Sequence, residues 1–145
     1  MSAQAHHKIK NEECLACHQD KTLTKDVNGK PVSLFIDSGK MKDSVHGAMF
    51  SCVDCHADIK ESPHMTTPRK VECAQCHADA VVAYGRSYHA RANKAGEPAA
   101  TCASCHGDVH QIVPANDPQS PVSHAHVPAT CGACHGQKFI VGAGG

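Results

Sequence analysis

Hydrophobic residues are sparse along the chain, and only one pair of segments has a clear strand pattern. Leu23 to Val27 and Val32 to Ile36 are rich in β-favouring residues, and Asn28-Gly29 lies between them. This dipeptide predicts a β-hairpin, because it readily adopts the positive φ angles of a tight type I′ turn. Pro31 indicates an edge position on the second arm, since proline cannot donate a ladder hydrogen bond.

Helices are expected only as short pieces. Alanine-rich stretches favour helix at Lys40 to Phe50, at Ala78 to Lys94, and around each of the cysteine-containing turns described below. The sequence therefore predicts a mostly irregular fold with short α-helices and one small β-hairpin. Breakers separate these pieces, at Ser62-Pro63, Thr67-Pro68, Gly96-Glu97-Pro98, Pro114 to Pro121 and Val127-Pro128.

The composition does not suit a domain built on its own hydrophobic core. Leu, Ile, Val and Phe supply 23 of the 145 residues, and tryptophan is absent. Burying so little apolar area offsets little of an ordering cost of about 1–2 kcal/mol per residue. The net charge of +0 argues against nucleic-acid binding. The sequence contains no run of 18 apolar residues, so it predicts no transmembrane segment.

Ten cysteines and thirteen histidines stand out, and the cysteines follow a single rule. Each belongs to a Cys-x-x-Cys pair that is followed at once by histidine. This motif is the attachment site of c-type haem, in which two cysteine sulfurs bond to the porphyrin edge and the histidine binds iron. The five copies are Cys14, Cys17 and His18; Cys52, Cys55 and His56; Cys73, Cys76 and His77; Cys102, Cys105 and His106; and Cys131, Cys134 and His135.

Other uses of the cysteine pairs explain the pattern less well. A four-cysteine zinc site uses two pairs, so five pairs leave one over, and the following histidine has no role. Disulfides within each pair would close strained rings, and thioredoxin-like redox pairs need a βαβ scaffold that the sequence does not predict. We therefore expect five covalent haems to replace the hydrophobic core of one domain spanning residues 1–145. The hairpin would pack over a haem, with residues 1–8 and 142–145 flexible.

Haem of this type is attached on the outer side of the energy-transducing membrane. We therefore expect an exported chain that acts in the periplasm or outside the cell. No secretory signal is recognisable in the sequence given, although Ser2 to Ala5 resembles the end of a cleavage site.

Eight histidines remain after the five that follow cysteine pairs, enough to provide each iron with a second axial ligand. His110 lies too close to His106 to bind the same iron, so we expect it to bind a neighbouring haem. Methionine is a less favoured sixth ligand where imidazoles suffice. The predicted distal ligands are His46, His64, His89, His110 and His124, while His6, His7 and His126 remain as alternatives.

Beyond the motifs, three segments resemble small multihaem c-type cytochromes, related to class III cytochromes and to pentahaem electron donors of periplasmic reductase systems. The resemblance runs from about Glu12 to Gly136 and implies bis-histidine haems in close-packed pairs, and electron transfer without catalysis. The presence of both His124 and His126 departs from the pattern and leaves the choice between them open. The segments are Ser44 to Gly47, Cys105 to Ile112, and Ser120-Pro121-Val122 leading to Pro128 to His135.

Three function classes remain in competition. The first is an electron carrier or conduit with unidentified redox protein partners; haem propionates would make it acidic, so a partner needs a basic patch. The second is a reductase with one open iron, for which Tyr84, Arg86, Tyr88 and His89 form the only suitable cluster. The third is a protomer of an extracellular conducting filament, in which His6 or His7 would bind a haem of the next copy.

Overall fold

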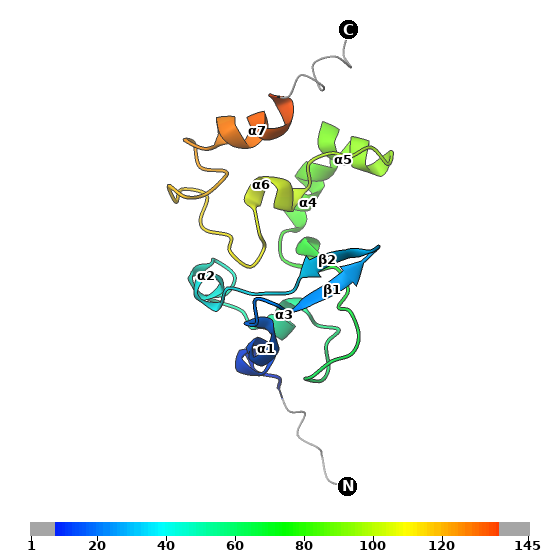
Figure 1. Ribbon diagram of the computed structural model, residues 1–145. Coiled ribbons are helices and arrows are strands. Elements are labelled where there is room, and N and C mark those ends of the chain that lie inside the picture. The colour runs from blue at the N-terminus through cyan, green and yellow to red at the C-terminus, as the bar shows by residue number, and fades with distance from the viewer. Residues whose placement is uncertain (1–7, 137–145) are drawn as a thin grey trace. The chain divides into compact units, whose positions relative to one another are not determined.

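The computed structural model describes residues 8–136, and these form short helices and one hairpin joined by long irregular segments (Figure 1). The expected fold class is confirmed at this level. Of the segments expected to be flexible, residues 1–7 and 142–145 lie outside the described residues. The elements, in chain order, are α1 Asn11–His18, β1 Thr24–Val27, β2 Lys30–Ser33, α2 Ser38–Asp43, α3 Cys52–Cys55, the 3-10 helix η1 Cys73–Gln75, α4 Ala78–Gly85, α5 Tyr88–Lys94, α6 Cys102–His106 and α7 Val127–His135.

The described residues fall into two compact units. Residues 8–42 and 46–72 belong to unit one, which carries the first two cysteine motifs. Residues 43–45 and 73–136 belong to unit two, which carries the other three.

The β-hairpin of unit one forms around the predicted turn. Asn28 and Gly29 have φ values of 54° and 79°, which confirms the type I′ geometry. The second strand is β2, Lys30–Ser33, and not the predicted Val32 to Ile36. A two-residue turn pairs Val27 directly with Lys30, so the strand has to begin there.

Leu34 extends the pairing of the hairpin by one residue beyond β2, and Ile36 then bonds to the end of α1. The backbone N–H of Ile36 donates to the carbonyl of His18 at 2.7 Å, and that of Leu34 to the carbonyl of Leu23 at 2.9 Å. The end of the hairpin is thus attached to the histidine of the first motif.

Two predicted helices are shorter than expected. The helix predicted at Lys40 to Phe50 is α2, which begins after the cap residue Asp37 and ends at Asp43. It stops because the N–H of Val45 donates to the carbonyl of Ile112 at 2.8 Å and not to the preceding turn. The helix predicted at Ala78 to Lys94 is divided into α4 and α5. The division falls at Ser87, whose hydroxyl accepts the N–H of Ala90 at 3.1 Å and caps α5.

Buried apolar side chains are scarce, as the composition predicts. Within residues 8–136 the buried hydrophobic residues are Ile9 and Ile59, both in unit one. In unit two the buried residues are serines, namely Ser44, Ser120 and Ser123. Neither unit contains a hydrophobic core of ordinary size.

Candidate functional site

Each cysteine motif lies on a short helical turn, as predicted. The cysteine pairs belong to α1, α3, α6 and α7, and the third motif begins in η1. Because residues three apart share one face of a helical turn, the two cysteines of a motif point to the same side. The histidine ends α1, α6 and α7 and directly follows α3, whereas in the third motif it precedes α4 as the N-cap residue.

Two histidines of unit one form the first notable pair. The ring centroids of His18 and His64 are 6.2 Å apart, and their ring planes differ by 13°. His18 is the last residue of α1, whereas His64 lies in the irregular segment that follows α3. Both side chains are half-buried. The fold thus brings a predicted proximal histidine to a predicted distal one.

Both rings of this pair are held in the same tautomer. Nδ1 of His18 donates to the carbonyl of Leu34, and Nδ1 of His64 donates to the carbonyl of Thr66, each at 2.8 Å. A carbonyl oxygen can only accept, so the proton of each neutral ring resides on Nδ1. Nε2 is then the atom of each ring with a lone pair for a metal. Metal-binding histidines in proteins commonly have this arrangement.

The ring separation also fits a shared metal. A bound imidazole nitrogen lies about 2 Å from the metal and its ring centroid about 1 Å further, so opposite ligands have centroids about 6 Å apart. Ordinary aromatic packing covers about 4.5–7 Å, so the separation alone does not distinguish the two cases. The two bonds to carbonyls favour the interpretation as metal ligands, because simple packing of two rings would not require both to have the same tautomer.

A second pair lies in unit two. The ring centroids of His89 and His135 are 5.9 Å apart, with planes inclined by 47°. His135 ends α7, and His89 is the second residue of α5, the helix that Ser87 caps. Again a predicted proximal histidine lies beside a predicted distal one.

The other candidate histidines have varied surroundings. Nδ1 of His110 lies 3.3 Å from a carboxylate oxygen of Asp108, and Nδ1 of His126 lies 3.1 Å from the hydroxyl of Ser123. These contacts would orient either ring as a ligand. His46 lies in the turn after α2, His56 follows α3, and His77 precedes α4. Between residues 8 and 136, His106 and His124 have no second ring beside them. His6 and His7 lie outside the described residues.

The first two cysteine motifs meet in unit one. Oδ1 of Asn11, at the start of α1, accepts the backbone N–H of Cys52 at 2.9 Å. Burial raises the pKa of the Cys52 thiol to about 11, and electrostatic repulsion from Cys14 and a hydrogen bond that the Cys52 thiol donates to the Cys14 sulfur contribute further. Sequence reasoning did not identify Asn11, because its partner is forty-one residues away along the chain.

The start of α3 is fixed by a local contact. The backbone N–H and the hydroxyl of Ser51 both donate to Oδ2 of Asp54, each at 2.7 Å. These bonds lower the pKa of Asp54, because they stabilise its carboxylate. These two bonds cap the helical turn on which the second motif begins.

Of the residues considered for a catalytic cluster, Tyr84 is used in packing and Tyr88 is exposed. The hydroxyl of Tyr84 donates to the carbonyl of Ala100 at 2.9 Å and accepts the side-chain amide of Asn93 at 2.9 Å. Tyr88 is 80% exposed, with the guanidinium of Arg91 over its ring. Tyr84 thus joins α4 and α5 to the segment before α6.

The chain's cysteines are not engaged in other common sites. No disulfide joins any of the ten, all of which lie in the described range. No group of three or more His, Cys, Asp or Glu side chains suited to a metal ion occurs among residues 8–136. A haem iron needs only two axial ligands from the protein, so a pair of histidines is the relevant pattern.

None of the helices within residues 8–136 is long and apolar enough to cross a membrane. No family model, curated protein or solved structure matches the chain. The functional argument therefore depends on the motifs and on the histidine pairs.

Proposed function

We propose that this chain is an electron-transfer protein with five c-type haems, each held by one Cys-x-x-Cys-His motif and by a second histidine. The observation that carries the proposal is the His18 and His64 pair. In both rings the Nδ1 bond leaves Nε2 as the nitrogen with a lone pair, and the ring separation suits one metal between them. When bound, haem iron supplies a one-electron redox couple.

The residues of each motif would have distinct roles. The two cysteines anchor the porphyrin edge through thioether bonds, and the following histidine binds iron. His64 would complete the ligands at the first motif and His89 at the fifth. The carbonyls of Leu34 and Thr66 hold their histidine rings in one tautomer and make Nε2 a stronger donor. Two imidazoles stabilise the ferric state more than an imidazole and a thioether do, so low potentials are expected.

Two filled axial positions favour electron transfer over catalysis at the first and fifth motifs. A reductase requires an open coordination position and nearby proton donors. His64 and His89 would occupy those positions, and the hydroxyl of Tyr84 already bonds to Ala100 and Asn93. We therefore place the chain among carriers or conduits.

The proposal includes a location and a kind of partner. Covalent haem attachment implies export to the periplasm or the cell exterior. Haem propionates would add negative charge to a polypeptide of net charge +0, so a basic surface on a redox partner would favour docking.

Mass spectrometry and electron paramagnetic resonance (EPR) test this function together. The intact chain is expected to carry five haems, and the oxidised protein to show only low-spin ferric signals at neutral pH. A mass below five haems would refute the proposed cofactor content. Five haems with a substantial high-spin population would instead favour the reductase alternative.

A further inference from the structure

The first two cysteine motifs approach each other through their first cysteines. Cys14 and Cys52 are the first cysteines of their motifs, and the Cys14 thiol lies near enough to contribute, after burial, to the raised pKa of the Cys52 thiol. Cys14 lies on α1 and Cys52 begins α3, and both are half-buried in unit one. Two motifs distant in sequence are thus joined at equivalent positions.

Asn11 makes a direct link between these two helical turns. Its Oδ1 accepts the N–H of Cys52, which is the first residue of α3. The N-terminus of α1 is capped separately, because the backbone N–H of Lys10 donates to Oε1 of Glu13 at 2.8 Å. The side chain of Asn11 is therefore not needed to cap its own helix.

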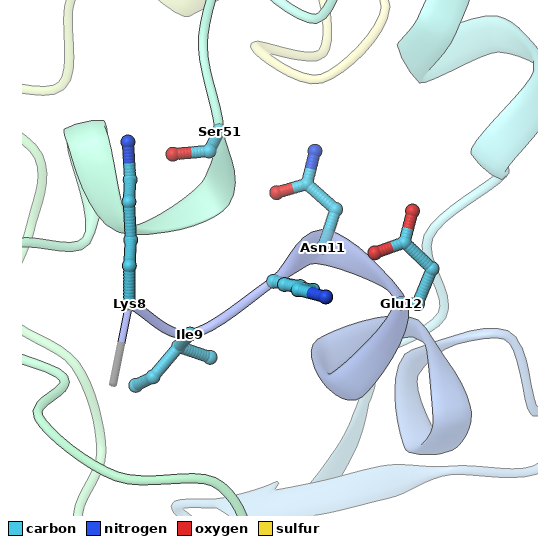
Figure 2. A pocket seen from close by; sticks show the side chains of 6 residues that line it. Lys8, Ile9, Asn11, Glu12 and Ser51 are labelled. Atoms are coloured by element: carbon cyan, nitrogen blue, oxygen red, sulfur yellow. The ribbon is translucent and has the colours of Figure 1, made fainter.

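Figure 2 shows the same junction from close by. Asn11 extends from the start of α1 toward the turn that carries Ser51, and both residues line a shallow pocket with Lys8, Ile9 and Glu12. The bond from Asn11 to Cys52 is half-buried, so water competes with it less than at an exposed site.

We propose that Asn11 is a positioning residue that holds Cys14 against Cys52, so that the first two haems meet at their cysteine-bonded edges as a coupled pair. This inference rests on the proposed function. Each cysteine bonds to the edge of its own porphyrin, and sulfurs in contact therefore bring those two edges together. Contact at the edges shortens the path for electron exchange between the two centres.

The test uses the full haem-loaded chain and three variants. Asn11→Ala removes the acceptor, Asn11→Asp keeps an oxygen at the same place, and Asn93→Ala removes a comparable side-chain amide from unit two. Asn93 accepts the N–H of Ala99 and makes no contact with a cysteine motif among the interactions of the described residues. Each protein is examined by EPR in the oxidised state and by a redox titration followed optically.

In the unmodified chain, two of the five low-spin signals should be broadened by magnetic interaction, and reduction of one of these haems should lower the potential of the other. Asn11→Ala should lose both effects, whereas Asn11→Asp and Asn93→Ala should retain them. Five magnetically isolated haems in the unmodified chain would overturn the proposal, as would unchanged coupling in Asn11→Ala. Isolated low-spin haems would leave the electron-transfer function standing, while missing or high-spin haems would count against the function itself.

Discussion

At the residue scale, the sequence identified candidate ligands but could not pair them. His64 and His89 were predicted as distal ligands from their positions before cysteine motifs. Each meets the histidine of a distant motif, and His64 meets one that precedes it in the chain. Which histidines come together depends on how the irregular segments between the motifs fold back, and no local sequence pattern encodes that. The hydrogen bonds to the carbonyls of Leu34 and Thr66 could likewise not be predicted, because every residue has a backbone carbonyl and the sequence does not show which one accepts.

Replacement of His64 by methionine should alter one haem of five. Because a thioether stabilises the ferrous state relative to imidazole, one haem should titrate at a higher potential, or become high-spin if methionine does not bind. A redox titration and an EPR spectrum of the His64→Met chain measure this.

Met65 provides the control for that substitution. It is 96% exposed and adjacent to His64, so Met65→Leu should leave all five haems unchanged. Identical titrations for His64→Met and the unmodified chain would remove His64 from the ligand set. A change in Met65→Leu alone would point to methionine as the ligand.

At the scale of elements, the hairpin turn was predictable and its second strand was not. Asn28 and Gly29 have positive φ, as their dipeptide predicts. The hydrophobic run at Leu34 to Ile36 suggested a longer second arm. Leu34 still bonds to Leu23 of the first arm, but Ile36 bonds to His18 at the end of α1. Tertiary contacts therefore determine where the strand ends, and propensity does not.

Gly29→Ala should destabilise the hairpin by about 1–2 kcal/mol, because alanine in a left-handed conformation is strained. The midpoint of thermal unfolding, followed by circular dichroism, should fall. Gly85→Ala is the matched control, since Gly85 has no positive φ and no atom would lie within 4 Å of the added Cβ. An equal decrease in both variants would contradict the turn argument.

The division between α4 and α5 supports a second prediction at this scale. Ser87 caps α5, the helix that carries His89. Ser87→Ala should cost about 1 kcal/mol of stability, while Ser87→Thr should retain most of it because its hydroxyl can still accept. Chemical denaturation measures both variants, and equal stability of Ser87→Ala and the unmodified chain would refute the role of this cap.

For the whole molecule, the composition predicted the absence of a hydrophobic core, and the packing agrees. Ile9 and Ile59 are the buried hydrophobic residues of the described range, and other apolar side chains such as Val82 and Tyr88 are exposed. Sequence reasoning did not predict two compact units, because the boundary depends on contacts such as Val45 with Ile112.

The chain without haem should therefore not fold cooperatively. So few buried side chains cannot offset the entropy of ordering the backbone. Far-UV circular dichroism and limited proteolysis of chain produced without haem attachment should show an unfolded, rapidly cleaved polypeptide. The haem-loaded chain serves as the comparison. A cooperative unfolding transition in the haem-free chain would contradict this prediction, because it would show that the polypeptide folds without haem.

The pairing of His18 with His64 has a consequence for the order of maturation. A polypeptide threaded through a membrane from its N-terminus delivers Cys14, Cys17 and His18 well before His64 emerges. The first centre would then be anchored while one axial position was still open to water or to a transient ligand. At the fifth motif the order is reversed, since His89 emerges before His135. The haem at the first motif would thus receive its second axial ligand late, whereas the haem at the fifth motif could receive its own as soon as His135 emerges.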